Sequence, residues 1–217
     1  MNNLISFPLK SSKIAIILNG ERESHLILQN NWHSYEHIIV CDGAWNDINT
    51  KLVEKEIDKI TVLGDGDSIK NSPKNFIKIQ DEDSTDFEKA IKWLLKKNAH
   101  KKQIHVDVFW ANGKSLDHTL GNLAIASQYA QKVTCHFYAE QQYYRFVEND
   151  FSIKSNAEKT VSIFPYPEYF VKSSSGLKYP MCDYPMQVNT QQSLRNEISA
   201  NDAFIAGTGS CFVFIQL

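Results

Sequence analysis

Short apolar runs alternate with segments of helical spacing over the first part of the chain. Continuous apolar runs are typical of strands buried on both faces, and they occur at 14–18, 38–41, 60–63, 104–109 and 133–138. Apolar residues at helical spacing predict helices over 87–95 and from about 117 to 130. Thr85 and Glu88 form a capping box at the start of the first helix. This alternation favours an α/β layer with a mainly parallel sheet flanked by helices.

The pattern changes after about residue 140, where short strand-like runs are separated by turn residues. The predicted strands are 145–148, 152–154, 160–164, 170–174, 203–206 and 211–215, and the predicted turns contain Asn149-Asp150, Ser155-Asn156 and Gly207-Thr208-Gly209. No segment of ten residues there has a convincing helical pattern. We therefore predict two domains, an α/β domain at 1–140 and an all-β sandwich at 141–217.

The composition is that of an ordinary soluble protein. The 217 residues include 23 Lys and Arg against 25 Asp and Glu, which gives a net charge of −2. This balance predicts no binding of nucleic acid or of an anionic membrane. No apolar stretch is long enough to cross a bilayer. The cysteines are far apart in sequence, so we expect reduced thiols in a cytoplasmic protein, at Cys41, Cys135, Cys182 and Cys211.

The apolar run at 60–63 leads into two aspartates, Asp65 and Asp67, each preceded by a glycine. Residues two apart on nearly extended backbone can face the same side, and Gly64 and Gly66 let the backbone turn tightly and approach a ligand. Two neighbouring carboxylates repel each other unless a cation lies between them. Oxygen ligands of this kind suit Mg²⁺. The alternative is a polar turn, because Gly-Asp pairs are common in turns.

Four successive strand ends carry polar turns. They contain Asp42-Gly43 with Asn46, Asp65 with Asp67, Asp81 with Asp83 and Asp86, and Asn112-Gly113-Lys114-Ser115 with Asp117-His118. Taken singly, an aspartate near a helix start is explained by capping, and His118 by a position on a helix surface. Together they lie where open α/β sheets bind ligands. Helix N-termini can bind phosphate and carboxylates can bind a cation, so together they indicate a magnesium-bound nucleotide. The chain contains neither a Walker loop nor a dinucleotide-binding fingerprint.

Six blocks in order along the chain, over about residues 14–217, resemble the thiamin pyrophosphokinase family. The blocks are Cys41-Asp42-Gly43-Ala44-Trp45-Asn46, Gly64-Asp65-Gly66-Asp67-Ser68, Asp81-Glu82-Asp83-Ser84-Thr85-Asp86 with Lys89-Ala90, Asp117-His118 with Asn122, Gly176-Leu177-Lys178-Tyr179-Pro180, and Asn196-Glu197. The resemblance implies transfer of a diphosphoryl group from ATP to the hydroxyl of thiamin, which yields thiamin diphosphate and AMP with Mg²⁺ as cofactor. It also implies a homodimer in which the β domain and the partner subunit complete the thiamin site.

The resemblance further implies roles for individual residues. Asp65, Asp67 and Asp86 correspond to metal ligands and, with Asp117, to the catalytic group. The expected phosphate and nucleotide pocket comprises Asp42, Asn46, Ser68, Thr85, Lys114 and His118. Glu82 and Asn196 correspond to residues near thiamin. The general base stays open among Asp86, Asp117 and His118.

The chain departs from the family pattern at four positions. Gly66 replaces an aromatic residue, Ser115 an arginine, Arg195 a serine and Glu82 a glutamine. Lys114 can supply the positive charge lost at Ser115, but without the bidentate geometry of a guanidinium. Two alternatives therefore remain: a diphosphokinase for another hydroxyalkyl heterocycle such as a pterin, and a non-catalytic protein that binds thiamin or nucleotide.

Overall fold

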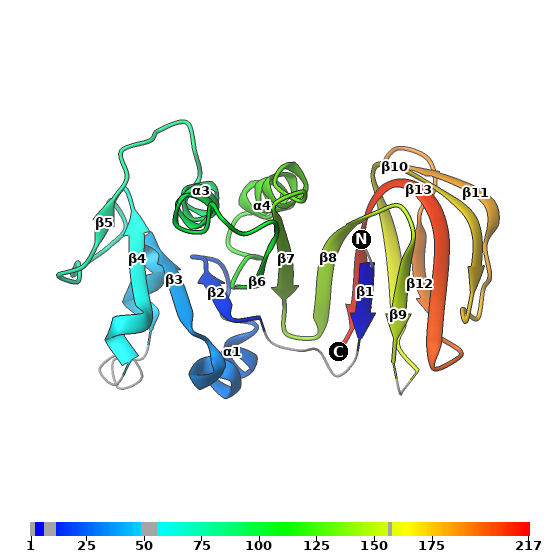
Figure 1. Cartoon of the computed structure of the whole chain (residues 1–217), viewed down its shortest axis with the longest axis horizontal. Helices are drawn as coiled ribbons and strands as arrows, with labels where there is room; N and C mark the ends of the chain where they lie inside the picture. The colour runs from blue at the N-terminus through cyan, green and yellow to red at the C-terminus, as the bar shows by residue number, and fades with distance from the viewer. Residues whose placement is uncertain (1–2, 7–11, 49–55, 156–157) are drawn as a thin grey trace. The chain divides into compact units, whose positions relative to one another are not determined.

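The computed structural model describes residues 3–6, 12–48, 56–155 and 158–217, which form two compact units (Figure 1). One unit comprises 11–140 and is called the α/β unit; the other comprises 1–10 with 141–217 and is called the β unit. The division after residue 140 coincides with the predicted boundary. Strand β1 (Asn3–Ser6), in the segment predicted for the α/β domain, instead belongs to the β unit, because it pairs with β9 (Phe151–Lys154).

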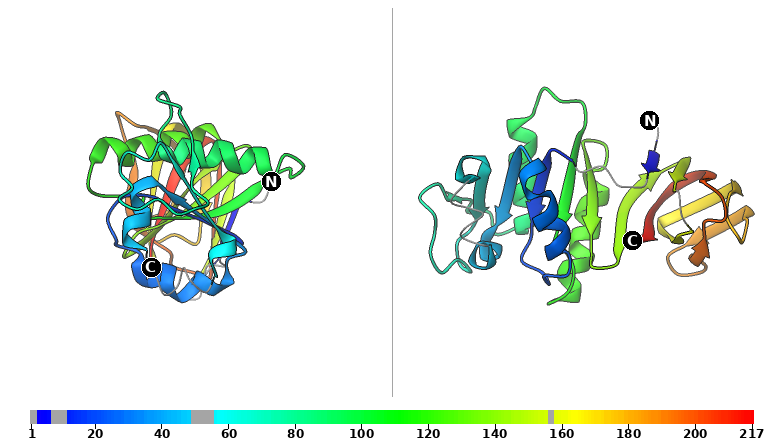
Figure 2. Two further views of the ribbon diagram at one scale, coloured as in Figure 1. Left: turned by 90° about the vertical axis from the view of Figure 1, so that its left-hand side faces the viewer. Right: turned by 90° about the horizontal axis from the view of Figure 1, so that it is seen from below.

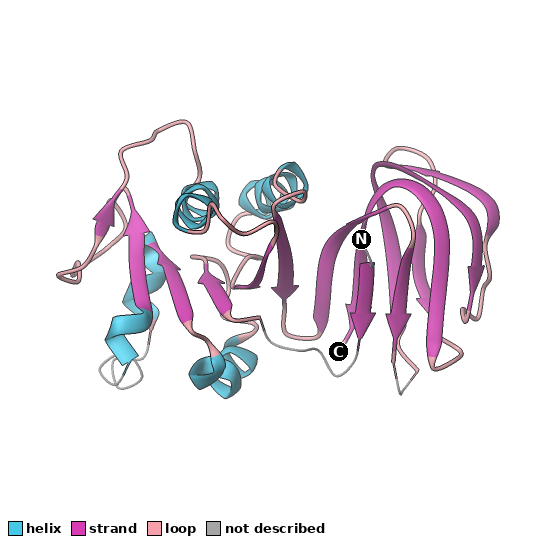
Figure 3. Ribbon diagram, in the orientation of Figure 1, coloured by secondary structure: helices cyan, strands magenta, loops and turns pink. Residues whose placement is uncertain are grey.

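The α/β unit is built on a parallel sheet (Figure 3). In spatial order its strands are β7 (Val133–Tyr138), β6 (Ile104–Phe109), β2 (Ile14–Ile17), β3 (His37–Cys41), β4 (Ile60–Gly64) and β5 (Ile77–Lys78). The helices are α1 (His25–Asn31), α3 (Asp86–Lys97) and α4 (Leu116–Gln128), with the 3₁₀ turns η1 (Trp32–Ser34), η2 (Asp42–Asp47) and η3 (Ile57–Lys59). The expected parallel sheet flanked by helices is therefore present.

The order of these strands determines where the helices lie. The chain moves in one direction across the sheet from β2 to β5, then returns to β6 and β7 on the other side of β2. Since parallel crossovers are right-handed, α1 covers one face and α3 and α4 cover the other, as Figure 1 shows. Aliphatic strand residues such as Ile16, Val40 and Val62 are completely buried between the helical layers. This burial on both faces explains why the strands are continuous apolar runs in the sequence.

The β unit is almost entirely strands (Figure 2). The long β13 (Asp202–Gln216) pairs with β8 (Gln142–Glu148), β9 and β10 (Thr160–Ser175), all antiparallel. β10 also pairs with β11 (Cys182–Gln187) and β12 (Ser193–Glu197). The core contains Val161, Ile163, Ile205, Phe212 and Val213. The strand-rich C-terminal region was expected from the sequence.

Two boundaries in the β unit differ from the prediction. The runs at 160–164 and 170–174 are parts of the single strand β10, and those at 203–206 and 211–215 are parts of β13. Gly207 and Gly209 therefore lie inside β13 and not in a turn. A Cβ atom at Gly207 would lie 2.3 Å from Tyr169 Oη, so this glycine makes room for the tyrosine of the neighbouring strand. Asn156, predicted in a turn with Ser155, lies outside the described residues.

None of the helices in the described part of the chain combines the length and the apolar character that crossing a membrane requires. The described structure also contains elements that we did not predict: α1, β1, β5, β11 and β12. Each of them is short or partly exposed, and so carries little periodic signal.

Candidate active site

A cavity of about 420 Å³ opens at the carboxyl ends of the central strands of the α/β unit. Its walls come from the segments that follow β2, β4 and β6, from the end of β3, and from the N-terminal parts of α3 and α4. The strand order reverses between β2 and β6, and ligands bind at such reversals in open α/β sheets. Seven residues predicted for the site line this cavity: Asp65, Asp67, Ser68, Thr85, Asp86, Lys114 and His118.

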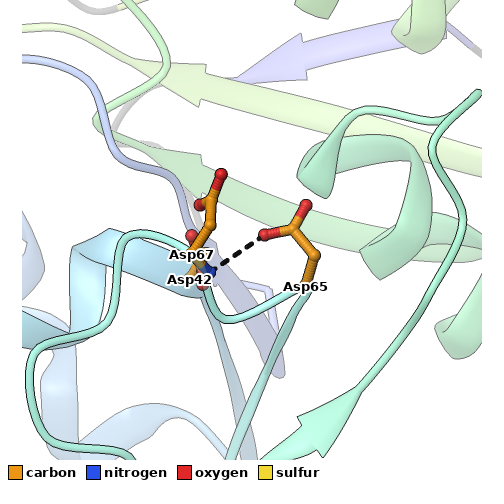
Figure 4. A group of neighbouring side chains, drawn as sticks. All are labelled: Asp42, Asp65 and Asp67. Carbon is orange, nitrogen blue, oxygen red and sulfur yellow. Dashed lines mark hydrogen bonds between the residues drawn. The ribbon is translucent and has the colours of Figure 1, made fainter.

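Three aspartates from two adjacent strand ends form what we call the carboxylate cluster: Asp42, Asp65 and Asp67 (Figure 4). Each offers an oxygen atom, and these atoms all lie within 4.8 Å of one another. The Asp67 amide donates to Asp65 Oδ1 at 3.2 Å, which folds the Asp65–Gly66–Asp67 segment into a tight turn. Gly66 has φ +86°, a conformation that glycine adopts without strain. The close approach predicted for Asp65 and Asp67 is therefore seen.

Asp42 is the buried member of the carboxylate cluster. It begins η2 with φ +39°, is only 2% exposed, and its oxygens accept from the Gly66 and Ser68 amides, each at 3.2 Å. A Cβ atom at Gly64 would lie 2.8 Å from Asp42 Cβ, so the strand ends approach this closely because residue 64 is glycine. Burial, reinforced by the negative charge of Asp86, raises the pKa of Asp42. We expected Asp42 in the nucleotide pocket; its carboxylate lies with Asp65 and Asp67.

A buried lysine links the carboxylate cluster to Asp86. Lys89 is 3% exposed, and its Nζ donates to Asp65 Oδ2 at 2.9 Å and to Asp86 Oδ1 at 3.1 Å. Its burial lowers its pKa, but the hydrogen bonds to the two carboxylates outweigh that effect, so the net pKa is raised. Lys89 is therefore a charged ammonium held between two acidic groups.

The two carboxylates that Lys89 joins differ in their electrostatics. The hydrogen bond from Lys89 lowers the pKa of Asp65. Burial raises the pKa of Asp86, although Lys89 opposes the shift. Asp86 lies in the first turn of α3, where the helix dipole favours a negative charge, and Thr85 caps this helix by accepting from the Glu88 amide at 3.3 Å. The predicted capping interaction of Thr85 is thus present.

Another part of the cavity wall is formed by the turn before α4. Lys114 has φ +51°, and its Nζ donates to Asn19 Oδ1 at 3.1 Å. The Ser115 hydroxyl donates to Asp117, and this hydrogen bond lowers the pKa of Asp117. His118 and Ser115 line the cavity, which places polar donors at the N-terminus of α4.

Five residues predicted for the site do not line the cavity: Asp42, Asn46, Glu82, Asp117 and Asn196. Asn46 donates to the Ser68 carbonyl at 2.8 Å and accepts from the Lys70 amide at 3.0 Å. These hydrogen bonds hold the backbone that follows the acidic turn. Asp117 is exposed and accepts from the His118 amide at 2.9 Å. Glu82 is exposed on the segment before α3.

Asn196 belongs to the β unit, where its side chain bonds to backbone. It accepts from the Tyr179 amide at 3.1 Å and donates to the Tyr179 carbonyl at 2.8 Å. It thereby holds the segment 176–180, one of the blocks that resemble the family, against β12. The side-chain amide of Asn196 acts within the β unit as a structural clamp.

Sequence reasoning did not assign a role to Lys89 or Asn19, although both line the cavity. Lys89 follows Asp86 by three residues on a helix, a spacing that places two side chains on one face and could have indicated the pair. Asn19 follows the first buried strand, where a ligand-facing polar residue is expected in this fold.

Comparisons with known proteins agree on one family. The family model described as thiamin pyrophosphokinase, catalytic domain, matches residues 28–138. Thiamin pyrophosphokinase 1 of Caenorhabditis elegans is 25% identical over 219 residues, which cover 95% of this chain and 90% of the relative.

Solved structures show the same fold. Thiamin pyrophosphokinase from Candida albicans superimposes with a TM-score of 0.80 at 20% identity, covering 100% of this chain and 93% of that one. The yeast enzyme gives a TM-score of 0.79 at 16% identity, with coverage of 100% and 91%. The family model spans the strands and turns that build the cavity, and the relative extends the similarity over both units. The chain belongs to the thiamin pyrophosphokinase family.

Proposed function

We propose that this protein transfers a diphosphoryl group from ATP to the hydroxyl of thiamin and releases thiamin diphosphate and AMP. The observation that carries the proposal is the convergence of Asp65, Asp67 and Asp86 on one cavity at the strand reversal. Membership of the family supports the reaction and both substrates. A structural or interaction-only module would have no use for acidic groups gathered in this way, because they repel one another.

The donor set fits a magnesium ion. Carboxylate oxygens are the ligands that Mg²⁺ prefers, usually one or two from the protein together with substrate phosphates. Asp65, Asp67 and Asp86 would hold the ion, and the carboxylate cluster also offers an oxygen of Asp42. When bound, Mg²⁺ would neutralise charge on the phosphate oxygens.

Several other residues of the cavity suit a polyphosphate. Phosphoryl transfer depends mainly on positioning and on charge stabilisation. Lys114, Ser115 and the N-terminus of α4 supply donors in the same cavity as the acidic turn. In the reaction the thiamin hydroxyl oxygen bonds to the β-phosphorus, and the bond from that phosphorus to the α–β bridging oxygen breaks, with AMP as the leaving group.

The proton of the hydroxyl needs an acceptor in the cavity. Of the three bases considered, Asp86 and His118 line the cavity, whereas Asp117 is bonded to Ser115 and to the His118 amide outside it. We therefore favour Asp86 or His118 over Asp117 for this role. The proposed contribution of Asp117 is to hold the first turn of α4.

We also propose a cytoplasmic homodimer in which the β unit, with Asn196, contributes to the thiamin site. The support for this proposal is membership of the family. Analytical ultracentrifugation of the purified protein would measure the oligomeric state. A monomer at micromolar concentration, with full activity, would contradict the dimer.

The test of function is an assay with ATP, thiamin and Mg²⁺ in which AMP and thiamin diphosphate are measured by chromatography. Equal amounts of the two products are expected, and excess chelator should abolish both. Hydroxyalkyl pterins in place of thiamin test the first alternative, which Ser115, Arg195 and Glu82 motivate. Calorimetric binding of thiamin with no AMP formed would support the non-catalytic alternative.

A further inference from the structure

Lys89 places a positive charge inside a site that we propose for a metal cation. Its side chain is 3% exposed and lines the cavity, and its Nζ lies 2.9 Å from Asp65 Oδ2 and 3.1 Å from Asp86 Oδ1. Both carboxylates are proposed metal ligands. The lysine therefore interacts with the same groups as the ion would.

Asp65 divides its two oxygens between the lysine and the turn. Oδ2 accepts from Lys89, while Oδ1 accepts from the Asp67 amide at 3.2 Å. The group is thus oriented without a metal, and Lys89 supplies one positive charge against the carboxylates of Asp42, Asp65, Asp67 and Asp86. An ammonium this close opposes a bare divalent cation by Coulomb repulsion and attracts the negative phosphates of a nucleotide.

We propose that Lys89 determines specificity for the form in which the metal enters: it disfavours a bare divalent cation and favours the metal–ATP complex. This inference rests on the proposed function, because it assumes that a metal and ATP share the cavity. In this role the ammonium of Lys89 compensates the negative charge of the acidic residues when no ligand is bound. When the metal–ATP complex binds, the negative charge of its polyphosphate makes it favourable for the ammonium and the metal ion to lie close together.

A lysine that only holds the acidic residues in place predicts a different result. Its removal would disorder Asp65 and Asp86 and weaken the binding of the bare ion and of the complex together. A lysine that acts by its charge predicts opposite changes for the two ligands. Only the second result identifies a specificity-determining residue.

The experiment measures the binding of Mn²⁺ by electron paramagnetic resonance, with and without an ATP analogue that has a methylene group in place of the α–β bridging oxygen. The variants are Lys89→Met, which removes the charge, and Lys89→Gln, which removes the charge but keeps a hydrogen-bond donor. We expect bare Mn²⁺ to bind about tenfold more tightly to both, and the Mn²⁺–analogue complex to bind about tenfold more weakly.

Lys92→Met is the matched control. Lys92 lies on the same helix, pairs with Glu88 at 3.3 Å and Asp81 at 3.5 Å, and does not line the cavity. Lys92→Met removes the same charge as Lys89→Met, but from a side chain that is 47% exposed. Both affinities should therefore stay within about twofold of the wild-type values, because solvent screens a surface charge.

Weaker or unchanged binding of bare Mn²⁺ to the two Lys89 variants would overturn the inference. If neither variant folds, the wild-type protein decides: bare Mn²⁺ must bind more weakly than the Mn²⁺–analogue complex, and the reverse order would also overturn it. The AMP assay on the wild-type protein is independent of these measurements. A protein that shows the binding pattern but forms no AMP would refute the proposed function and leave the role of Lys89 intact.

Discussion

Asp67 is an acidic residue of the carboxylate cluster whose charge can be removed with little effect on its surroundings. It is exposed, its carboxylate accepts from the Ser68 hydroxyl at 2.9 Å, and it has no ion pair with Lys89. Asn has nearly the same shape as Asp and still accepts a hydrogen bond. A change in activity in Asp67→Asn therefore reports on the lost negative charge.

We expect Asp67→Asn to lower kcat for AMP formation by about 10²-fold or more, a loss typical of a group that stabilises transition-state charge. The midpoint of thermal unfolding should change little, since an exposed substitution alters the unfolding free energy by about 0.5 kcal/mol at most. Asp83→Asn is the control, because Asp83 is exposed and does not line the cavity. Near-normal turnover of Asp67→Asn at saturating Mg²⁺ would show that Asp67 is not a metal ligand.

His37 couples the stability of the α/β unit to pH. Its ring stacks on Trp93 of α3, with centroids 5.5 Å apart and planes at 11°, and its Nε2 has no hydrogen-bond partner among the described residues. Burial lowers the pKa of His37 below the ordinary value of 6.5. The folded protein therefore resists protonation at a pH where the unfolded chain accepts the proton.

This shift predicts the sign of a pH effect. Above pH 6.5 the histidine is neutral in both the folded and the unfolded state. As the pH is lowered below 6.5, the unfolded chain binds the proton first. The free energy of unfolding therefore decreases as the pH is lowered, until the pKa of the folded state is reached. The loss from one group is at most about 1.4 kcal/mol per pH unit. His37→Phe keeps a ring against Trp93 and should flatten the decline, as measured by urea unfolding at pH 7.5 and 5.5. Equal slopes for the two proteins would rule out this contribution.

The end of β4 is close to the start of η2, and a glycine makes this possible. Gly64 has φ +156°, and a Cβ atom there would lie 2.8 Å from Asp42 Cβ. We expect Gly64→Ala to lower the unfolding free energy by about 1–3 kcal/mol, as overpacked sites do. Because Asp42 must move, the carboxylate cluster should open and AMP formation should fall with it.

A second glycine in the same unit gives the opposite prediction and serves as the matched control. Gly121 lies inside α4, and a Cβ atom there would contact nothing within 4 Å. Gly121→Ala should raise the unfolding free energy by about 0.5–1 kcal/mol, because alanine loses less conformational freedom in a helix. Activity should be unchanged. If both variants changed activity equally, the argument from the contact with Asp42 would fail.

Secondary structure was predictable where burial follows a simple pattern. The strands of the parallel sheet are apolar on both faces, so they stand out as continuous runs. The strands β10 and β13 are long but interrupted by Pro165, Pro167, Gly207 and Gly209, which are turn residues in most sequences. The pairing of β10 with β13 shifts register between Pro165 and Tyr169, and this irregularity accommodates the interruption. Such accommodation depends on the neighbouring strand and cannot be read from local sequence.

The site was predictable in outline for a different reason. Parallel strands bring their carboxyl ends to one edge, so residues after β4 and β6 had to approach the same cavity. The grouping of Asp42 with Asp65 and Asp67 depends on the positive φ of Asp42 and on its hydrogen bonds to two amides. The pairing of Lys89 with Asp65 joins residues from a helix and a strand end. Neither arrangement follows from spacing alone.

The two units have separate cores, but the cavity belongs to one of them. All residues that line it lie between Leu18 and Asn122, within the α/β unit. The chain as a whole carries a net charge of −2, which is small, so the acidic character of the site arises from local clustering. A ligand that binds there should stabilise the α/β unit directly.

Binding of the metal–nucleotide complex should therefore raise the thermal stability of the protein. A ligand at 100 times its Kd adds about 2.7 kcal/mol to the unfolding free energy, which for a chain of this size corresponds to a rise in Tm of about 5–10 °C. Calorimetry with Mg²⁺ and the methylene analogue of ATP should show this rise, and chelator should reverse it. Mg²⁺ alone should change the Tm little, because Lys89 already compensates the negative charge of Asp65 and Asp86.

The two units offer an internal control for the same experiment. If they unfold in separate transitions, the ligand should shift only the transition of the α/β unit, because linkage acts on the cooperative unit that holds the site. In Asp67→Asn the shift should be reduced while the other transition keeps its temperature. An equal rise of both transitions in the Asp67→Asn variant would mean that the nucleotide stabilises the protein without the carboxylate cluster, and would place its binding elsewhere.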